Sequence, residues 1–289
     1  MSKPIPKPSR ILLTVLFSLT LLLCGCRPIV ISDPPPPIPP SPWALVWSDE
    51  FSSPDGSSPD PKKWTYAIGG NGWGNRELEY YTNRPENAHV EKGNLVITAK
   101  QENYTGADGV TRDYTSSRVK TQGFFTQTYG RFEARIKIPE GQGIWPAFWM
   151  LGEDIPSVGW PKCGEIDIME NIGKEPGTVH GSLHGPSTVG RTSDLTAIFK
   201  LPPGQAFADD FHLYAVEWEP DMVRFYVDSN LYASFHSSEW PAGGIWVFNH
   251  PFFIILNLAV GGDWPGSPGA STKFPQSMIV DYVRVYTKR

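Results

Sequence analysis

The sequence is poor in cysteine and has no cluster of basic residues. Its 289 residues include only three cysteines, and 25 Lys and Arg stand against 30 Asp and Glu, a formal net charge of −5. Processing before Cys26 would leave Cys163 as the single remaining thiol, which excludes an internal disulfide network. The acidic balance argues against a nucleic-acid partner. Stability must therefore come from a hydrophobic core.

Long amphipathic helices, internal repeats and a hydrophobic run long enough to span a membrane are also missing. The most apolar stretch, residues 11–23, is shorter than the ~20 residues that a membrane span needs. Lys3, Lys7 and Arg10 precede it, and this order of basic and apolar regions is typical of an export signal. We therefore expect residues 1–25 to be a signal peptide of the lipoprotein type.

The residues that follow predict a lipid anchor and a tether. Residues 23–26, Leu-Cys-Gly-Cys, resemble a bacterial lipobox with Cys26 as the lipidated residue. Cys24 is an unusual occupant of its position, so ordinary secretory cleavage stays open. Residues 26–42 are rich in proline and favour an extended polyproline II spacer. We expect an exported protein, either a cell-envelope lipoprotein of the outer membrane or cell surface, or a secreted one.

Short alternating segments separated by Gly, Pro, Asn and Asp fill the remainder of the chain. Residues 130–138 alternate apolar and charged side chains, as a half-buried strand does. Further strands are expected at residues 212–219, 223–228, 231–235, 252–260 and 278–286, with a turn through Ser229-Asn230. This pattern predicts an all-β fold, a two-sheet antiparallel β-sandwich of the jelly-roll kind, as one domain over residues 43–289.

One apolar run carries three carboxylates. Glu165, Asp167 and Glu170 alternate with Ile166, Ile168 and Met169, so the run reads as a buried strand. Strict alternation would put Met169, not Glu170, on the face of the other two acids. A β-bulge around Ile168 and Met169 would return Glu170 to that face.

Clustered, buried carboxylates acquire pKa values that differ from one another. This difference is what allows one carboxyl to act as an acid while its neighbour acts as a nucleophile. The alternative is a structural carboxylate ladder that binds calcium or pairs with arginine. The 11 Trp and 11 Tyr favour the first interpretation, because aromatic faces are what proteins offer to sugar rings.

The acidic run and its surroundings resemble glycoside hydrolase family 16. The spacing with one extra residue before the last Glu is similar to that of the laminarinase-type branch, the endo-β-1,3-glucanases. The resemblance spans nearly the whole domain and is carried by residues 47–51, 75–82, 94–99, 129–133, 143–150, 164–173 and 256–262. It implies a concanavalin A-like jelly roll with a concave substrate groove, and hydrolysis of β-glucans by a double displacement that retains the anomeric configuration.

The resemblance assigns roles to the three acids. Glu165 would be the nucleophile and Glu170 the acid/base. Asp167 lies between them and would set the ionisation and orientation of Glu165.

The resemblance also implies a set of substrate-binding residues. For any one Trp the alternative is core packing, which we expect for Trp43, Trp47 and Trp218. Loop polar residues can equally stabilise turns. The residues expected to contact sugar are Trp145, Trp149, Trp264, Asn75, Arg76, Arg84, His184 and Asn257. We expect His184 to lie near the acid/base, and His180 to be structural.

No cofactor is expected for catalysis, but the resemblance implies a structural calcium. Its ligands would be Glu50, the carbonyl of Gly93 and Asp281, on the face away from the groove. Hard oxygen ligands suit calcium, although the two carboxylates could equally pair with arginine. His180 and His184 lack a third ligand at suitable spacing for a metal site. Cys163 is expected to be an inert thiol.

Two other functions fit the same scaffold. One is another polysaccharide specificity, such as β-1,3-1,4-glucan, against which the extra residue before Glu170 argues. The other is a non-catalytic glucan-binding protein, although such proteins typically lose a catalytic carboxylate. The expected partner is thus a β-glucan polysaccharide, with no nucleic acid, a membrane only through a lipid on Cys26, and the chain as a monomer.

Overall fold

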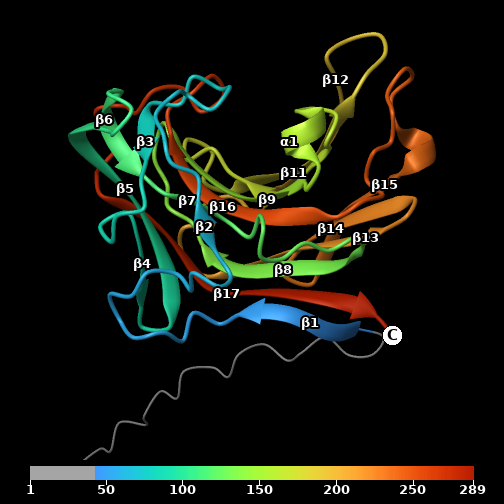
Figure 1. Ribbon diagram of the computed structural model, residues 1–289, viewed down its shortest axis with the longest axis horizontal. Coiled ribbons are helices and arrows are strands. Elements are labelled where there is room, and N and C mark those ends of the chain that lie inside the picture. Colours follow the sequence, from blue (N-terminus) through green and yellow to red (C-terminus); the bar gives the residue numbers. More distant parts are fainter. Residues whose placement is uncertain (1–42) are drawn as a thin grey trace, which may run out of the picture. The chain divides into compact units, whose positions relative to one another are not determined.

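The computed structural model describes residues 43–289, which form two β-sheets (Figure 1). The signal peptide, the lipidation at Cys26 and the tether lie outside the described residues, so they stay predictions. Helical structure within residues 43–289 is limited to α1 (Ile155–Val158) and the 3₁₀ turn η1 (Ser237–Glu239). Neither of these helices is long and apolar enough to cross a membrane.

The first sheet has ten strands and forms the outer layer. Its order is β15-β14-β13-β8-β17-β5-β6-β3, with β1 added to β17 and β4 to β5. All its pairings are antiparallel except β3 with β6. The strands are β1 (Trp43–Asp49), β3 (Glu79–Tyr81), β4 (Ala88–Glu91), β5 (Asn94–Thr105), β6 (Thr111–Ser116), β8 (Gly130–Lys137), β13 (His212–Glu219), β14 (Met222–Val227), β15 (Asn230–His236) and β17 (Gln276–Lys288).

The second sheet has seven strands, all antiparallel, and carries the acidic run. Its order is β12-β11-β10-β9-β16-β7-β2. The strands are β2 (Thr65–Tyr66), β7 (Arg118–Lys120), β9 (Ile144–Gly152), β10 (Glu165–Glu170), β11 (Thr178–Pro186), β12 (Thr192–Lys200) and β16 (Phe252–Val260). The acidic run is therefore β10, with two strands on one side of it and four on the other.

A single large apolar core lies between the two sheets. All nine residues of β16 are buried, as their continuous apolar sequence predicts. From β10, the core takes Ile166, Ile168 and Met169, and from β13 it takes Trp218. The predicted β-sandwich is confirmed, and strands β13 and β16 have the predicted bounds.

One predicted turn is shifted by a residue. The β14–β15 turn was expected at Ser229-Asn230, but Asn230 already begins β15 and the turn lies at Asp228 and Ser229. Asp228 adopts a left-handed φ of 54°, which Asp tolerates better than most residues because its side chain bonds locally. Its Oδ1 accepts the backbone N–H of Leu213 at 2.9 Å. That bond holds the turn at Asp228 and Ser229, one residue before the expected position.

Candidate active site

A β-bulge in β10 places the three acids on one face. Against β9, Asp167 pairs with Trp149 and Met169 with Phe148, so Ile168 is the extra residue. Against β11, the register shifts between Asp167 and Glu170 in the same way. The predicted bulge around Ile168 and Met169 is confirmed. It allows Ile168 and Met169 to enter the core while Glu170 rejoins the face of the other acids.

That face opens into a groove of about 500 Å³. Part of its lining comes from four neighbouring strands, β10, β9, β16 and β7, so the groove crosses the sheet, and loop residues and α1 complete it. Four indoles line it together with the three acids. The full lining is Asn71, Trp73, Gly74, Asn75, Glu77, Arg118, Trp145, Ala147, Trp149, Leu151, Ile155, Trp160, Glu165, Asp167, Glu170, Arg191, Asn257 and Ala259.

Each outer acid accepts a hydrogen bond from its own indole. Trp160 donates its Nε1–H to Oε2 of Glu165 at 2.8 Å. Trp145 donates its Nε1–H to Oε1 of Glu170 at 3.0 Å. Both indoles come from segments other than β10, so the orientation of each carboxyl is fixed by tertiary contacts.

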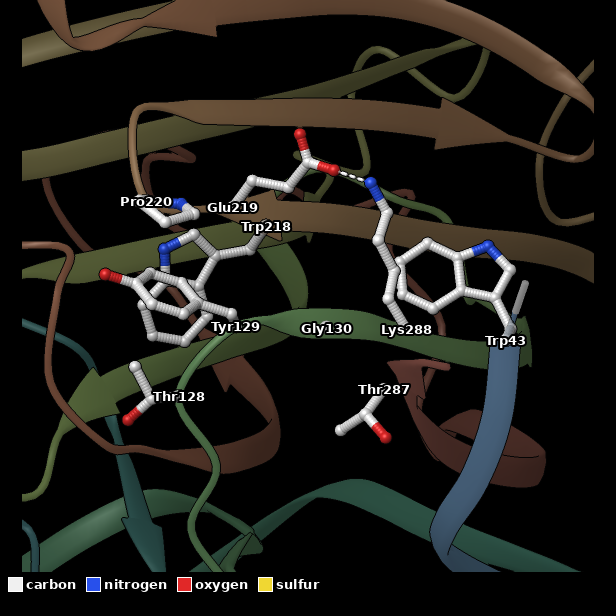
Figure 2. A pocket seen from close by; sticks show the side chains of 9 residues that line it. All are labelled: Trp43, Thr128, Tyr129, Gly130, Trp218, Glu219, Pro220, Thr287 and Lys288. Carbon is white, nitrogen blue, oxygen red and sulfur yellow. Dashed lines mark hydrogen bonds and ion pairs between the residues drawn. The ribbon is translucent and has the colours of Figure 1, made fainter.

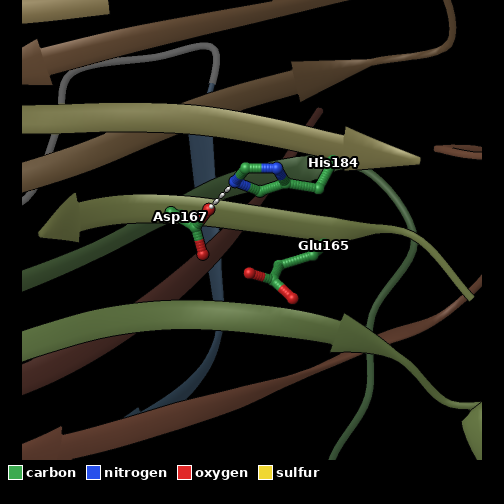
Figure 3. A group of neighbouring side chains, drawn as sticks. All are labelled: Glu165, Asp167 and His184. Carbon is green, nitrogen blue, oxygen red and sulfur yellow. Dashed lines mark ion pairs between the residues drawn. The ribbon is translucent and has the colours of Figure 1, made fainter. Parts of the chain in front are cut away.

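The middle acid, Asp167, contacts a histidine. Asp167 is buried, and its Oδ2 lies 3.0 Å from Nε2 of His184 on β11 (Figure 3). Ligand atoms of Glu165, Asp167 and His184 all lie within 4.8 Å of one another. The charge of each of the three groups therefore acts on the other two at short range.

Burial makes every carboxyl of this cluster hard to ionise. It raises the pKa of Glu165 to about 8, assisted by the charge of Asp167 and opposed by His184. Burial also raises the pKa of Glu170 well above its usual range, and the charges of Asp167 and Glu165 add to this effect. A carboxyl that keeps its proton at neutral pH is what a general acid requires.

The register corrects the expectation for His184 and leaves that for His180 as a prediction. His184 pairs with Glu165 at the nucleophile end of β10, not with the acid/base, whereas His180 pairs with Glu170. The imidazole of His180 packs edge-on against Trp264 with ring centroids 4.9 Å apart. Trp264 also meets Trp145 edge-to-face at 5.4 Å. The bulge brings Glu170 opposite His180, because β10 has one residue more than β11 between the Asp167 and Glu170 pairs.

Asn257 lines the groove and supports one of its indoles. It is only 6% exposed, and its Oδ1 accepts the Trp149 indole N–H at 2.7 Å. Its Nδ2 donates to the hydroxyl of Tyr81 at 3.1 Å, and that hydroxyl donates to Glu77 at 3.0 Å. The Asn257 amide thereby positions Trp149, and its predicted contact with substrate stays a prediction.

Of the other polar residues predicted to bind substrate, one lies in the groove lining, one lies beside it and one is elsewhere. Asn75 lines the groove. Arg76 is exposed and pairs with Asp263 at 2.5 Å. Arg84 is not a groove residue, which corrects the prediction. It pairs with Glu102 and stacks on Tyr104 at 4.6 Å, in the first sheet's β5–β6 region.

Arg118, Trp160 and Arg191 are among the groove residues that the sequence did not predict. Arg118 lies between the rings of Trp73, at 4.9 Å, and Trp149, at 4.5 Å. Arg191 stacks on Trp160 at 5.0 Å. No local sequence pattern marks Arg118, Trp160 or Arg191, because their partners come from distant segments.

The two carboxylates expected to bind calcium, those of Glu50 and Asp281, are engaged by arginines. Glu50 accepts two hydrogen bonds from Arg284, both at 2.9 Å, and Asp281 accepts one from Arg135 at 2.8 Å. Gly93 lies in the turn between β4 and β5, with φ of 73°. The carboxylates of Glu50 and Asp281 thus pair with arginines, which is the alternative that the sequence left open, and they are not free to bind calcium as they stand. A calcium ion there stays a prediction.

Two further features carry no catalytic group. Cys163 is fully buried, and burial and the nearby Glu165 raise the pKa of its thiol to about 12, so it stays protonated and unreactive. A second cavity of about 330 Å³ lies among Trp43, Tyr129, Trp218 and the ion pair of Glu219 with Lys288 (Figure 2). None of the residues predicted to be catalytic or substrate-binding lines it.

Comparisons with known proteins agree with this geometry. The pattern of Glycosyl hydrolases family 16 matches residues 75–284. The chain is 45% identical over 258 residues to a β-glucanase of Rhodothermus marinus, covering 84% of this chain and 85% of that protein. The laminarinase catalytic domain from Thermotoga maritima has 49% sequence identity and a TM-score of 0.78, covering 86% of this chain and 99% of that chain.

A second solved structure is equally similar. The endo-β-1,3-glucanase from Pyrococcus furiosus has 48% sequence identity and a TM-score of 0.80, covering 86% of this chain and 95% of that chain. With the family pattern matched over most of the domain and the acids gathered in an aromatic groove, the chain belongs to glycosyl hydrolases family 16.

Proposed function

We propose that this chain hydrolyses internal β-1,3-glucosidic bonds in β-glucans such as laminarin, with retention of the anomeric configuration. The observation that carries the proposal is the bulged strand β10, which presents Glu165 and Glu170 on one face of an indole-lined groove. The names of the similar Thermotoga and Pyrococcus proteins support β-1,3-glucan as the substrate.

The reaction follows from the roles of the two outer acids. Glu165 attacks the anomeric carbon as the glycosidic C–O bond breaks, and Glu170 gives its proton to the departing oxygen. Water then attacks the glycosyl ester and gives a proton back to Glu170, which releases Glu165 as a carboxylate. The indole N–H of Trp160 stabilises the Glu165 carboxylate before attack and after release.

The groove explains how a chain is held across this pair. Its lining includes the rings of Trp73, Trp145, Trp149 and Trp160, which offer flat apolar surfaces to sugar rings. Because the groove crosses four strands, it extends beyond the acids along the sheet, on the side of β9, β16 and β7. Such a groove suits the interior of a polysaccharide rather than only its end.

The test is a product profile on laminarin, lichenan, agarose and xyloglucan, with linkage analysis of the products. We expect reducing-sugar release to be highest on laminarin, and early ¹H NMR spectra to show the β-anomer first. Release mainly from lichenan would favour a β-1,3-1,4-glucanase. Laminarin binding without release of reducing sugar would favour a glucan-recognition protein.

The protein's place in the cell is part of the proposal. Residues 1–42 support export, lipidation at Cys26 and a proline-rich tether that holds the catalytic domain away from the envelope. Labelling with a fatty-acid analogue, in the full chain and in Cys26→Ser, tests this. We expect the label and the membrane-bound fraction to be lost together in the variant.

A further inference from the structure

The imidazole of His184 lies between two carboxylates from two strands. Its Nε2 is 3.0 Å from Oδ2 of Asp167 on β10, and its Nδ1 is 2.6 Å from Oδ1 of Asp194 on β12. Asp194 and His184 are directly opposed across the β11–β12 pair, as Glu165 and His184 are across the β10–β11 pair. The strand register thus links Asp194 to the catalytic strand.

The chemistry of the groups fixes where the protons lie. An ionised Asp194 can only accept a hydrogen bond, so Nδ1 of His184 must carry a proton. Nε2 lies 3.0 Å from Oδ2 of Asp167 at ion-pair distance, without a hydrogen bond between them, so an imidazolium would act on Asp167 through its charge. Whether Nε2 also carries a proton therefore decides whether His184 is neutral or an imidazolium.

The surrounding charges favour the imidazolium. Burial alone would lower the pKa of His184, but Glu165, Asp194 and Glu170 together raise it. The charged groups that face His184 are the three acids of β10 and Asp194 of β12. In return, the positive imidazole lowers the pKa of both Glu165 and Glu170 against the effect of burial.

We propose that Asp194 is a positioning residue that holds His184 as an imidazolium against Asp167, so that Glu165 is ionised when it attacks. The inference rests on the proposed function and deepens it. Asp194 lies on the edge strand β12 with its side chain 45% exposed, whereas the His184 side chain is 25% exposed and that of Asp167 is 3% exposed. An exposed residue at the sheet edge thereby controls the charge of a buried cluster.

The first test measures the proton on His184 directly. In Asp194→Asn the side chain keeps its shape but loses its charge, and its amide can donate to Nδ1, so a neutral imidazole becomes acceptable. Titration of the full chain by histidine-selective NMR, with His184→Gln for assignment, should show the pKa of His184 falling by about one unit or more in Asp194→Asn. Asp194→Glu, which retains the charge, should restore much of the shift.

The second test asks whether catalysis uses that charge. We expect the acidic limb of the kcat/KM profile on laminarin to move to higher pH in Asp194→Asn, because Glu165 loses the nearby positive charge that lowers its pKa. KM near the optimum should change less than twofold, because Asp194 is not part of the groove lining.

A matched control is Asp228→Asn, which removes the same charge from the His212–Asp228 pair on the first sheet, where Nδ1 lies 3.0 Å from Oδ2. This variant should leave the pH profile unchanged. The inference is overturned if the pKa of His184 is unchanged in Asp194→Asn. It is also overturned if that pKa falls while the pH profile of kcat/KM stays the same. A wild-type chain that does not cleave laminarin overturns the proposed function instead, and the NMR titration still reports on the link between Asp194 and His184.

Discussion

Trp160 donates its indole N–H to Oε2 of Glu165 over 2.8 Å, although Trp160 lies in the loop before β10 and Glu165 lies on it. Trp145 of β9 does the same for Glu170. The two carboxyls therefore receive their hydrogen bonds from separate parts of the chain. The orientation of each carboxyl is therefore set by a different indole.

Replacement of Trp160 by Phe removes one N–H and retains an aromatic ring for Arg191. Because that N–H lowers the pKa of Glu165, its loss should raise this pKa and move the acidic limb of kcat/KM to higher pH. A hydrogen bond to a charged group is worth about 1.5–3 kcal/mol, so kcat/KM should fall roughly tenfold to a hundredfold. A pH profile that matches the wild type would contradict the assignment of Glu165 as nucleophile.

Glu165→Gln and Glu170→Gln should fail in different ways. Glu165→Gln has no nucleophile and should be inactive on laminarin and on an activated aryl glucoside. Glu170→Gln lacks the general acid, which typically contributes about 10²–10⁴-fold, and this loss should appear on laminarin but much less on a substrate whose leaving group needs no proton. Unchanged circular dichroism and laminarin binding would show that both variants fold. Near-normal hydrolysis by Glu165→Gln would contradict the role of Glu165 as nucleophile.

Glu165→Gln should also stabilise the protein, increasingly as the pH rises. The pKa of Glu165 is raised to about 8 in the folded state, so ionisation disfavours folding as the pH rises from about 4.5 to 8. Below pH 4.5, Glu165 is protonated in the folded and in the unfolded protein, so the substitution adds no stability through ionisation. At pH 8 we expect a gain on the order of 2 kcal/mol, or roughly 4–8 °C in Tm.

Calorimetry at pH 4, 6 and 8 measures this trend, with the exposed Glu140→Gln as the matched control. The control should show no pH-dependent gain. A gain in Glu165→Gln that is the same at all three pH values would contradict the link to ionisation.

Asn257→Ala should lower both stability and substrate affinity. The change leaves the indole N–H of Trp149 and the hydroxyl of Tyr81 without their partner in a buried region. Each such loss costs about 1–3 kcal/mol, so we expect a fall of about 2–6 kcal/mol in the free energy of unfolding. KM should rise because Trp149 is no longer held, while kcat changes little. Unchanged thermal unfolding would show that the amide is not part of the network.

The strands were predictable because their signals are local. The alternation that marks β8 and the continuous apolar run of β16 follow from which side chains meet the core. The β14–β15 turn was misplaced by one residue because Asp228 bonds to Leu213, which is distant in sequence. Arg84 was assigned to the groove from the motif around it, but its position depends on Glu102 and Tyr104 of another strand.

The sequence by itself determined the three acids, their out-of-phase spacing and hence the bulge, because strand periodicity and the burial of apolar residues operate within a few residues. Only the tertiary structure decided which groups surround those acids. Trp160 holds Glu165, Trp145 holds Glu170, and His184 joins Asp167 to Asp194. Those contacts arise where loops and neighbouring strands converge, and hydrogen bonds and charges act through space rather than along the chain.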